Sequence, residues 1–393
     1  MTKNQPIEII PSAEIVRGRF SERLNRFVLR CAVEGQVCSA YLPNPGRLWE
    51  ILLPGCTLYL VRNPDTGGVK PKLPWTVVAA RRQGRPILLH THLANQVVAR
   101  LLEGGLMPGL NGARIVKREV QAGHSRFDFL LEAAGRPYLL EVKSCTLFGN
   151  RIAMFPDAVT ERGSRHLREL AAISLREGIS CGVVFVVHWS GARFFLPDYH
   201  TDPEFARTFL EMRERLDFRA IAVTWGQDLR LRPPVRELVI PWDLIDREHR
   251  DSGSYLLILE LARDLSLTVG GLGEILFRKG YYLYVGSARR GLTSRLARHL
   301  RRRKTLFWHI DYLRDRADGC TAVPIRSSRS LEHELAAALS QIAQWSIPDF
   351  GASDCRCPTH LFGMNEHPLR SHLFLDMLQH FRIDRLEAEL AGK

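Results

Sequence analysis

Two carboxylates and a lysine lie within two short segments that otherwise have the composition of buried strands. Asp128 is in RFDFLL, and Glu141 and Lys143 are in YLLEVK. The two segments flank AAGR, a tight reverse turn, which predicts an antiparallel hairpin centred between Ala134 and Gly135. In that register Asp128 faces Glu141 at a Cα separation of about 5.5 Å, and Lys143 lies on the same face of its strand as Glu141.

This arrangement predicts a divalent metal site. Carboxylates placed directly opposite each other destabilise a strand pair unless a cation lies between them. Two carboxylates suit Mg²⁺ or Mn²⁺, which bind phosphate-rich substrates, and Lys143 would orient the attacking water or offset charge on the phosphate. The alternative is that the carboxylates lie at a strand edge and pair with Arg126 and Lys143. The hairpin register favours metal-dependent hydrolysis of a phosphodiester.

A helix predicted around residues 158–175 adds basic groups. In DAVTERGSRHLREL, Arg162 and His166 are four residues apart on one helix face, and Arg165 lies beside them. Such a face would bind a phosphate or assist proton transfer; the alternative is a solvated helix face of mixed charge. Glu119, in the strand before the hairpin, is a further candidate metal ligand.

A second set of chemical groups lies in the last third of the chain. Tyr255 is in GSYLLIL, Tyr284 is in GYYLYVGSA, Arg295 is in a helical segment, and Glu332 is in LEHELAAAL. A tyrosine hydroxyl acts as a base only with help from a metal or cationic neighbours. An arginine binds a phosphate in forked geometry, and a single carboxylate holds Mg²⁺. The alternative is that the tyrosines only pack in a sheet, where aromatic residues are common.

The helical segment around Arg295 is strongly basic. From Arg289 to Lys304 eight residues are Lys or Arg and none is acidic, so this surface is expected to attract phosphate. The contacts predicted there are Arg298, His299 and Arg302. Leucines spaced four apart in the same segment, Leu292, Leu296 and Leu300, predict a buried stripe.

Two cysteines and a histidine near the end of the chain have the types of zinc ligands. Cys355, Cys357 and His360 lie within GASDCRCPTH, but a structural zinc site needs four ligands, and Cys320 would have to complete this one. We therefore expect reduced structural thiols here rather than zinc. His309 and Asp311, in HIDYL, are expected to be structural or to line the second site.

The elements that must position these groups divide the chain into three parts. Short alternating runs, separated by turn signals such as PNPGR, predict a small antiparallel barrel over residues 1–83. Over 84–240 the pattern becomes α/β, with a helical period in THLANQVVARLLEGG and a continuous apolar run, CGVVFVVHW, typical of a central strand covered on both faces. Prolines and a charge-rich run predict a linker near 240–252, and a third, α/β domain over 250–393.

Charge and composition favour a polyanionic partner. The chain has 393 residues, a formal net charge of +13 and a pI near 9.7, which indicates binding to nucleic acid or an anionic surface. Residues 1–12 lack a basic segment followed by an apolar run, and no apolar stretch reaches about 18 residues, so we expect neither a signal peptide nor a membrane span. The eight cysteines are scattered, as in a reduced, cytoplasmic protein.

Several motifs together resemble the sugar fermentation stimulation protein family: PNPGRLWEILLPG, SRFDFLL, YLLEVKSCTL and MFPDAVTERGSRHLREL. The resemblance covers residues 14 to about 230. It implies an N-terminal OB-fold-like DNA-binding barrel joined to a PD-(D/E)xK nuclease-like domain, with Asp128 as the motif aspartate and Glu141 and Lys143 as the ExK pair. The family is chiefly described as DNA-binding and is linked to the regulation of sugar metabolism.

The last third resembles an uncharacterised branch of the GIY-YIG nuclease superfamily. Tyr255 corresponds to the first motif, Tyr284 with Gly286 to the second, and Arg295 to the helix arginine. Glu332 fits the metal-binding glutamate better than Glu334 does. The usual late asparagine is not evident, and GASDCRCPTH stands roughly in its place.

The sequence thus predicts an α/β multidomain, DNA-binding protein with one or two Mg²⁺- or Mn²⁺-dependent nuclease sites. Single-stranded or branched DNA would bind the barrel through base stacking and a basic groove. The alternative is a non-catalytic DNA-binding regulator that uses nuclease folds as binding platforms. A small-molecule enzyme is not favoured, because the chain has no dinucleotide fingerprint. The barrel contacts predicted are Phe20, Arg26, Tyr41, Arg47 and Trp49.

Overall fold

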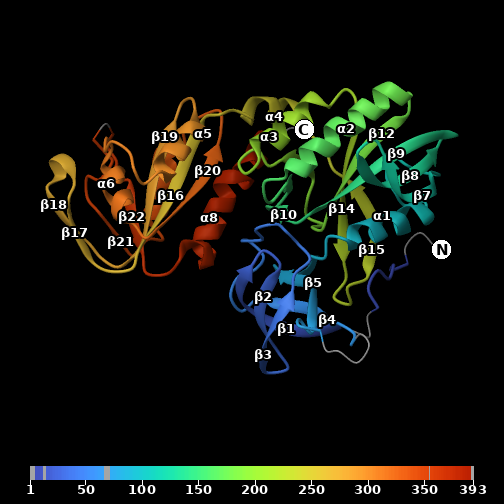
Figure 1. The fold of residues 1–393 in the computed structure, drawn as a ribbon, viewed down its shortest axis with the longest axis horizontal. Coiled ribbons are helices and arrows are strands. Elements are labelled where there is room, and N and C mark those ends of the chain that lie inside the picture. The colour runs from blue at the N-terminus through green and yellow to red at the C-terminus, as the bar shows by residue number, and fades with distance from the viewer. Residues whose placement is uncertain (1–4, 12–14, 66–70, 354, 391–393) are drawn as a thin grey trace. The chain divides into compact units, whose positions relative to one another are not determined.

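A computed structural model describes residues 5–11, 15–65, 71–353 and 355–390. Part of the N-terminal segment examined for a signal peptide lies outside these residues. The chain forms two compact units (Figure 1): Asp243–Arg385 make up the second, and the remaining described residues make up the first, including the short helix α9 (Glu387–Leu390). No helix among the described residues is long and apolar enough to cross a membrane.

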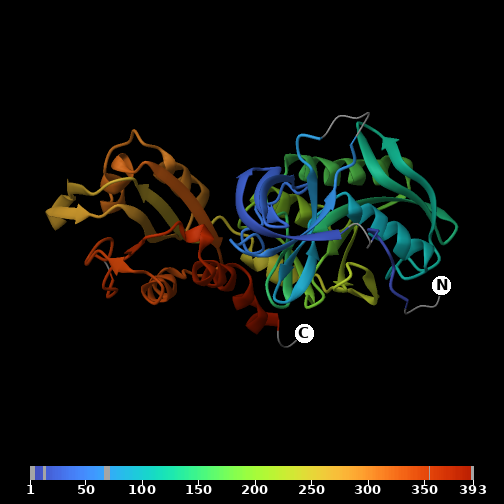
Figure 2. The ribbon, with the colours of Figure 1, turned by 90° about the horizontal axis from the view of Figure 1, so that it is seen from below.

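The first unit begins with a six-stranded sheet, five strands of which close into a barrel, drawn in blue in Figure 1 and Figure 2. Its strand order is β3-β2-β1-β4-β5-β6, and a parallel pairing between β3 and β5 closes it. Glu34 and Gly35 both have positive φ, the conformation of a two-residue hairpin turn, and they join β2 to β3. The strands are β1 (Ile15–Asn25), β2 (Val28–Val33), β3 (Gln36–Tyr41), β4 (Thr57–Arg62), β5 (Trp75–Arg82) and β6 (Arg85–Leu88).

A six-stranded sheet with helices on its faces follows in the same unit. Its order is β15-β14-β12-β9-β8-β7, and β12 runs parallel to both β9 and β14. Its elements are α1 (Leu93–Glu103), β7 (Arg114–Ala122), β8 (Ser125–Ala133), β9 (Arg136–Cys145), α2 (Glu161–Glu177), β12 (Ser180–Val187), α3 (Pro203–Glu211), β14 (Asp217–Trp225) and β15 (Leu231–Glu237). A smaller sheet contains β10 (Leu147–Phe148), β11 (Ile152–Phe155) and β13 (Phe194–Pro197).

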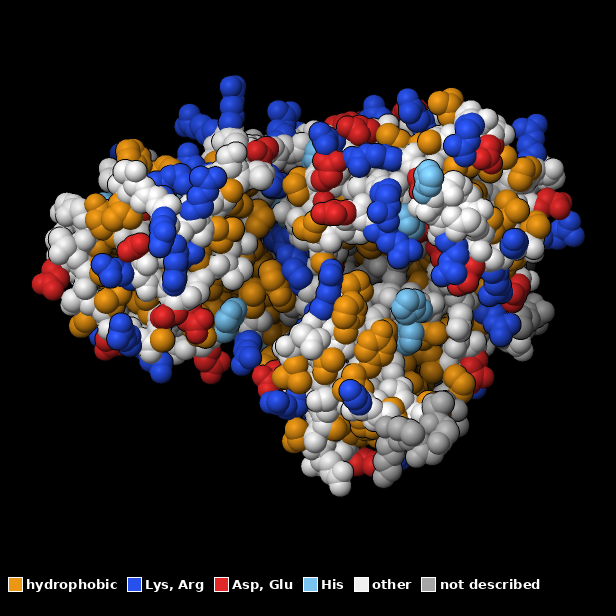
Figure 3. All heavy atoms as spheres, viewed as in Figure 1, with side chains coloured by type: hydrophobic (Ala, Val, Ile, Leu, Met, Phe, Trp, Pro, Cys, Tyr) orange, Lys and Arg blue, Asp and Glu red, His pale blue; other side chains and the backbone are white. Residues whose placement is uncertain are grey.

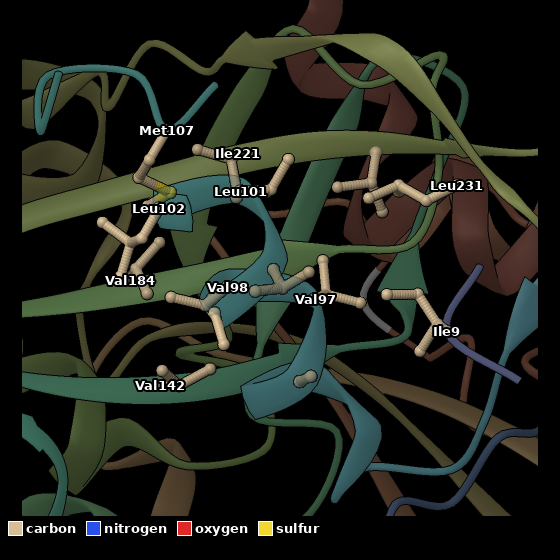
Figure 4. Packing of buried hydrophobic residues seen from close by; sticks show 14 of the residues in the cluster. Ile9, Val97, Val98, Leu101, Leu102, Met107, Val142, Val184, Ile221 and Leu231 are labelled. Carbon is tan, nitrogen blue, oxygen red and sulfur yellow. The ribbon is translucent and has the colours of Figure 1, made fainter. Parts of the chain in front are cut away.

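Helix α1 packs its apolar face against the sheet (Figure 4). Val98 of α1 and Val142, Val184 and Ile221 of three strands belong to one buried cluster. Full burial of each such side chain contributes about 1.5–3 kcal/mol. Because side chains alternate along a strand, burying Val142 under α1 turns its two neighbours, Glu141 and Lys143, toward the opposite face.

The second unit is built on a five-stranded antiparallel sheet of order β20-β16-β19-β22-β21, with a separate hairpin, β17-β18. Its elements are α4 (Trp242–Glu248, which begins one residue before the unit boundary), β16 (Gly253–Leu261), β17 (Leu265–Thr268), β18 (Glu274–Phe277), β19 (Gly280–Ala288), α5 (Leu292–Leu300), α6 (His309–Arg316), β20 (Gly319–Arg326), α7 (Glu332–Ser340), β21 (Trp345–Ser346), β22 (Leu361–Met364) and α8 (His372–Arg382).

The α/β fold class and the N-terminal barrel predicted from the sequence are confirmed, and three details differ. Strand β6 adds an edge strand to the sheet of the barrel past residue 83. The expected linker near 240–252 contains helix α4, which forms because Leu244 and Ile245 are buried. Helix α5 ends at Leu300, which is 42% exposed, and Arg301 has extended backbone, so the basic run beyond it is not helical.

Candidate active sites

The hairpin that carries Asp128 has the predicted register. Ala134 and Gly135 both have positive φ and form the turn. The last pair of the ladder is Phe129 with Leu140, one step short of Asp128 and Glu141. Beyond this last pair, the side chain of Asp128 is the hydrogen-bond acceptor: Asp128 Oδ2 accepts the backbone N–H of Val142 at 2.7 Å.

Asp128 is held from a second side by helix α1. Its Oδ1 accepts a hydrogen bond from Asn95 Nδ2 at 2.6 Å. Burial and the neighbouring Glu141 raise the pKa of Asp128 to about 6, although both hydrogen bonds and Lys143 act in the opposite direction. Ionised Asp128 therefore lacks enough positive charge around it, as expected of a carboxylate that binds a cation.

Glu141 is 4% exposed, and its two oxygens have different surroundings. Oε1 accepts hydrogen bonds from Lys143 Nζ and from His166 Nδ1, the latter at 2.7 Å. Although burial alone would raise the pKa of Glu141, Lys143 and His166 hold it below its usual range. Oε2 is buried and makes no hydrogen bond to any of the residues that the structure describes. A buried carboxylate oxygen without a partner is costly, and it fits the role of a metal ligand.

His166 reaches Glu141 from helix α2. Thr160 caps this helix by accepting the backbone N–H of Gly163 at 3.0 Å. Arg162 Nε donates to His166 Nε2 at 3.2 Å, which leaves the ring hydrogen on Nδ1, facing Glu141. His166 is only 2% exposed, so the prediction that it contacts a phosphate at the surface is wrong. Instead, the His166 ring positions Glu141 from the interior. Arg162 and Arg165 are exposed.

A cleft of about 350 Å³ brings these groups together with residues of the barrel. Its lining includes Asp128, Glu141 and Lys143 from the hairpin, Asn95 and His92 from α1 and its N-cap, Arg162 from α2, and Arg26, Asn44 and Gly46 from the barrel. Arg26 thus remains a predicted phosphate contact. Figure 3 shows Lys and Arg side chains spread over both units, with acidic side chains between them. Glu119 is exposed and pairs with Arg126 at 3.4 Å, so it is not near the other carboxylates of the cleft.

Arg47 does not have the role predicted for it. Its Nε donates to the backbone carbonyl of Asp157 at 2.9 Å, and its Nη2 donates to Thr201 at 2.7 Å and lies 3.6 Å from Asp198. The guanidinium also stacks on Trp49, 4.3 Å from the ring centre. Because these contacts occupy Arg47, it fastens the barrel loop to the central domain instead of presenting a charge to DNA. Phe20, at 5% exposure, is a core residue, whereas Tyr41 is exposed.

The second set of predicted residues also converges, in a cleft of about 440 Å³ in the second unit. Tyr255 comes from β16, Tyr284 from β19, Arg295 from α5 and Glu332 from the start of α7. Gly286 lies beside Tyr255, and a Cβ at this position would collide with the Tyr255 hydroxyl. Glu334, which fits the motif less well than Glu332, is exposed and pairs with Arg329 instead.

Tyr255 is 2% exposed, and its hydroxyl lies 2.9 Å from His299 Nε2. Burial raises the pKa of Tyr255, and Arg295 only partly offsets this effect. His299 is itself buried, which lowers its pKa, so the pair is neutral near pH 7. The opposite nitrogen of His299, Nδ1, faces the buried Asp311 at 3.7 Å.

The predicted phosphate contacts on α5 and just after it are largely occupied by protein groups. Arg298 donates to both oxygens of Asp311, at 3.1 and 2.9 Å, and Arg302 donates to the carbonyl of Ala317 at 2.6 Å. His299 is 1% exposed, so it is not a surface contact. The physical reason is the shortness of α5: the chain turns back after Leu300, and α6 supplies the acid that the basic segment lacks.

Two residues of the first cleft were not found from the sequence. Asn95 could not be predicted because its contact with Asp128 joins segments far apart in the chain. The sequence signal for this role was a polar side chain within a largely apolar helix. Asp157 follows a strand and accepts the backbone N–H of Leu48 at 2.7 Å. Burial raises its pKa to about 6, against the effect of Arg47.

Comparison with known proteins covers most of the chain. Three family profiles match: the SfsA N-terminal OB domain over residues 22–89, the sugar fermentation stimulation protein RE domain over 92–228, and a domain of unknown function, DUF123, over 254–383. The last of these is the part that resembles the GIY-YIG superfamily.

The relatives align with the first part of the chain. A sugar fermentation stimulation protein homolog from Methanothermobacter thermautotrophicus is 37% identical over 230 residues, which is 58% of this chain and 94% of the relative. A homolog from Moorella thermoacetica is 42% identical over 51% of this chain and 85% of its own length. The structure of Pyrococcus furiosus SfsA in complex with Ca²⁺ matches with a TM-score of 0.54 and 28% identity, covering 60% of this chain and 99% of that one.

The chain therefore belongs to the sugar fermentation stimulation protein family, and its second unit adds a DUF123 domain.

Proposed function

We propose that this protein binds DNA and hydrolyses its phosphodiester bonds with Mg²⁺ or Mn²⁺ at the site formed by Asp128, Glu141 and Lys143. The observation that carries the proposal is the buried Glu141 Oε2, which has no hydrogen-bond partner among the described residues and shares a cleft with a second carboxylate of raised pKa. The Ca²⁺ complex of the Pyrococcus furiosus relative supports it, since Ca²⁺ and Mg²⁺ both take oxygen ligands.

Each group in the cleft has a role in this proposal. Asp128 and Glu141 would hold the cation, which when bound supplies an activated water and neutralises charge on the phosphate. Lys143 stabilises the negative charge that develops on the phosphate. His166 keeps Glu141 ionised and oriented. Arg162 and Arg26 line the same cleft and would bind adjacent phosphates, and the net charge of +13 favours association with DNA.

DNA binding without hydrolysis is the second candidate function, and one observation favours it for the cleft around Tyr255. Burial raises the pKa of Tyr255, so its hydroxyl stays protonated near pH 7 and is a poor base. Arg295 and Glu332 would still provide a phosphate contact and a carboxylate there. We therefore propose the hairpin site as the hydrolytic centre and the second cleft as a DNA-binding surface.

Cleavage of labelled single-stranded, duplex and branched DNA with Mg²⁺ or Mn²⁺ tests the proposal. Asp128→Asn and Glu141→Gln should each lower the cleavage rate by at least about 100-fold, the loss typical of removing one electrostatic contact to the transition state. Glu132→Gln is the matched control, because Glu132 is a carboxylate of the same hairpin that pairs with exposed Arg114. Glu332→Gln should retain metal-dependent cleavage, because it removes a carboxylate of the second cleft and leaves the hairpin site intact.

Binding to the same DNA, measured by fluorescence anisotropy without metal, separates the two functions. Binding by all variants together with metal-dependent cleavage only by the intact protein, Glu132→Gln and Glu332→Gln is the expected result. Binding without cleavage by any protein would contradict hydrolysis and support the second candidate. Cleavage lost only in Glu332→Gln would place the hydrolytic centre in the second unit.

A further inference from the structure

We propose that His333, Cys355, Cys357 and His360 bind one zinc ion in the second unit. One ligand atom from each residue lies within 4.8 Å of all the others. Sequence spacing suggested only three of these residues and required Cys320 as a fourth. The structure instead brings in His333, from the first turn of α7, and Cys320 is not in the group formed by the described residues.

The separations between the ligand atoms approach those of a tetrahedral site. Cys355 Sγ lies 3.3 Å from His360 Nε2, and His333 Nδ1 lies 3.2 Å from Cys357 Sγ. Zn–S bonds of about 2.3 Å and Zn–N bonds of about 2.0–2.1 Å give an N···S edge of roughly 3.5 Å and an S···S edge of roughly 3.8 Å. Only small movements of the side chains are needed to admit the ion.

The donor set selects zinc over the cation proposed for the first cleft. Two thiolates and two imidazoles are a common set for structural Zn²⁺, whereas Mg²⁺ and Mn²⁺ prefer oxygen ligands. A bound Zn²⁺ would stabilise both thiolates.

His360 has the second partner that metal-binding histidines usually have. Its Nδ1 lies 3.1 Å from Glu332 Oε1, and the residue is 1% exposed. The 3.1 Å separation is an ion-pair distance, and protonation at Nδ1 leaves the lone pair of Nε2 facing Cys355. A carboxylate, a histidine and a metal in this order form a recurrent arrangement that orients the ring and increases its basicity.

The site would fix one wall of the second cleft. Three of the four ligands lie in the connection 347–360 between β21 and β22, and the fourth lies on α7. Gly351 and Ser353 of this connection line the cleft that contains Tyr255, as does Glu332. Zinc would therefore tie the connection to α7 and hold Glu332 through His360. This inference does not depend on the proposed hydrolysis at Asp128.

Zinc content and cobalt spectra of the full chain test the proposal. The intact protein, purified without chelator and dialysed, should hold about one zinc per chain by elemental analysis. Replacing the zinc with Co²⁺ should give the near-ultraviolet thiolate-to-cobalt band and the visible bands of a tetrahedral site. His333→Ala and Cys357→Ser should each lower metal affinity by at least about tenfold, since loss of even an outer partner costs this much.

Two cysteine variants serve as matched controls. Cys320→Ser removes the alternative fourth ligand, and Cys38→Ser breaks the thiol pair in the barrel, where Cys31 Sγ and Cys38 Sγ are 3.8 Å apart. Both variants should keep one zinc and an unchanged cobalt spectrum. A loss of zinc in Cys320→Ser equal to that in His333→Ala would overturn the assignment of His333. An intact protein that takes up no zinc or Co²⁺ after incubation would overturn the site.

The conservative variant His333→Cys covers the case in which His333→Ala does not fold. It keeps four ligands as a three-cysteine, one-histidine set, which also binds zinc. This variant should retain one zinc and show a stronger thiolate-to-cobalt band, because a third sulfur joins the site. An unchanged band in a protein that still binds Co²⁺ would show that residue 333 is not a ligand.

Discussion

At the scale of single residues, the carboxylates of the first cleft differ in what stabilises their charge. Glu141 is ionised because Lys143 and His166 surround one of its oxygens. Asp128 accepts hydrogen bonds from two neutral donors, the Val142 backbone and Asn95, and its pKa stays raised. Asp128 is therefore the residue whose charge should depend most on a bound cation.

This difference predicts a pH-dependent effect of Mg²⁺ on stability. The pKa of Asp128 rises from 3.8 to about 6 on folding, so its contribution favours folding at low pH and is lost as the pH rises from about 4 to about 6. Above pH 6, Asp128→Asn should be more stable than the intact protein by about 3 kcal/mol without metal. Mg²⁺ should stabilise the intact protein above pH 6 and have little effect below pH 5.

Thermal unfolding followed from pH 4 to pH 8, with and without Mg²⁺, checks this prediction. Glu132→Gln is again the control, since it removes an exposed carboxylate of the same hairpin. Equal stabilisation of the intact protein and Asp128→Asn by Mg²⁺ would contradict a role for Asp128 in metal binding.

At the scale of the elements, one arginine connects the barrel to the central domain. Arg47 neutralises the buried Asp157 and donates a hydrogen bond to Thr201. The Arg47 side chain is itself largely covered by protein. Arg47→Ala should cost about 3 kcal/mol, because it leaves a buried carboxylate without its cation.

Urea unfolding of the full chain measures this cost. Arg30→Ala is the matched control: Arg30 pairs with Glu22 on the barrel surface, where both side chains are well exposed, and its loss should change the free energy of unfolding by less than about 0.5 kcal/mol. Similar effects of the two substitutions would show that Arg47 does not hold the two parts together.

The same scale explains which parts of the site the sequence could predict. The hairpin register followed from strand alternation and the AAGR turn, both local features, and Phe129 opposite Leu140 confirms it. The α/β fold and the barrel followed from periodicity in the same way. Contacts between distant elements could not be predicted: Asn95 with Asp128, Arg47 with Asp157, and His333 with Cys357 each join segments whose packing no local pattern specifies.

Burial was the other quantity that the sequence did not supply. His166 and His299 stand among basic residues and suggested a surface, yet both are nearly fully buried. Each has a polar partner inside, Glu141 for His166 and Tyr255 for His299. The sequence therefore does not show whether a histidine on a charged helix face contacts solvent or forms a hydrogen bond in the interior.

At the scale of the whole molecule, the proposed DNA binding should weaken steeply with salt, because the net charge of +13 favours contacts with phosphates. Neutralising 6–10 phosphates would lower the affinity by about 10³–10⁵ between 50 and 200 mM salt. Arg26→Ala and Arg162→Ala should each lower the slope of log K against log salt by about one, since both residues line the first cleft.

Anisotropy titrations over this range of salt give the slopes. Arg30→Ala, which removes an exposed charge of the barrel outside the cleft, is the control and should leave the slope nearly unchanged. Equal slopes for all four proteins would mean that DNA does not enter the first cleft.

The first cleft is lined by the barrel as well as by the hairpin, and Arg47 fastens the barrel loop next to it. A DNA strand bound at Arg26 of the barrel would reach Asp128 and Glu141 at a fixed distance, along the DNA backbone, from the Arg26 contact. On the proposed function, the barrel therefore sets the cleavage position. The bond that is cut lies a set number of nucleotides from the bound end, and the digestion products share one length.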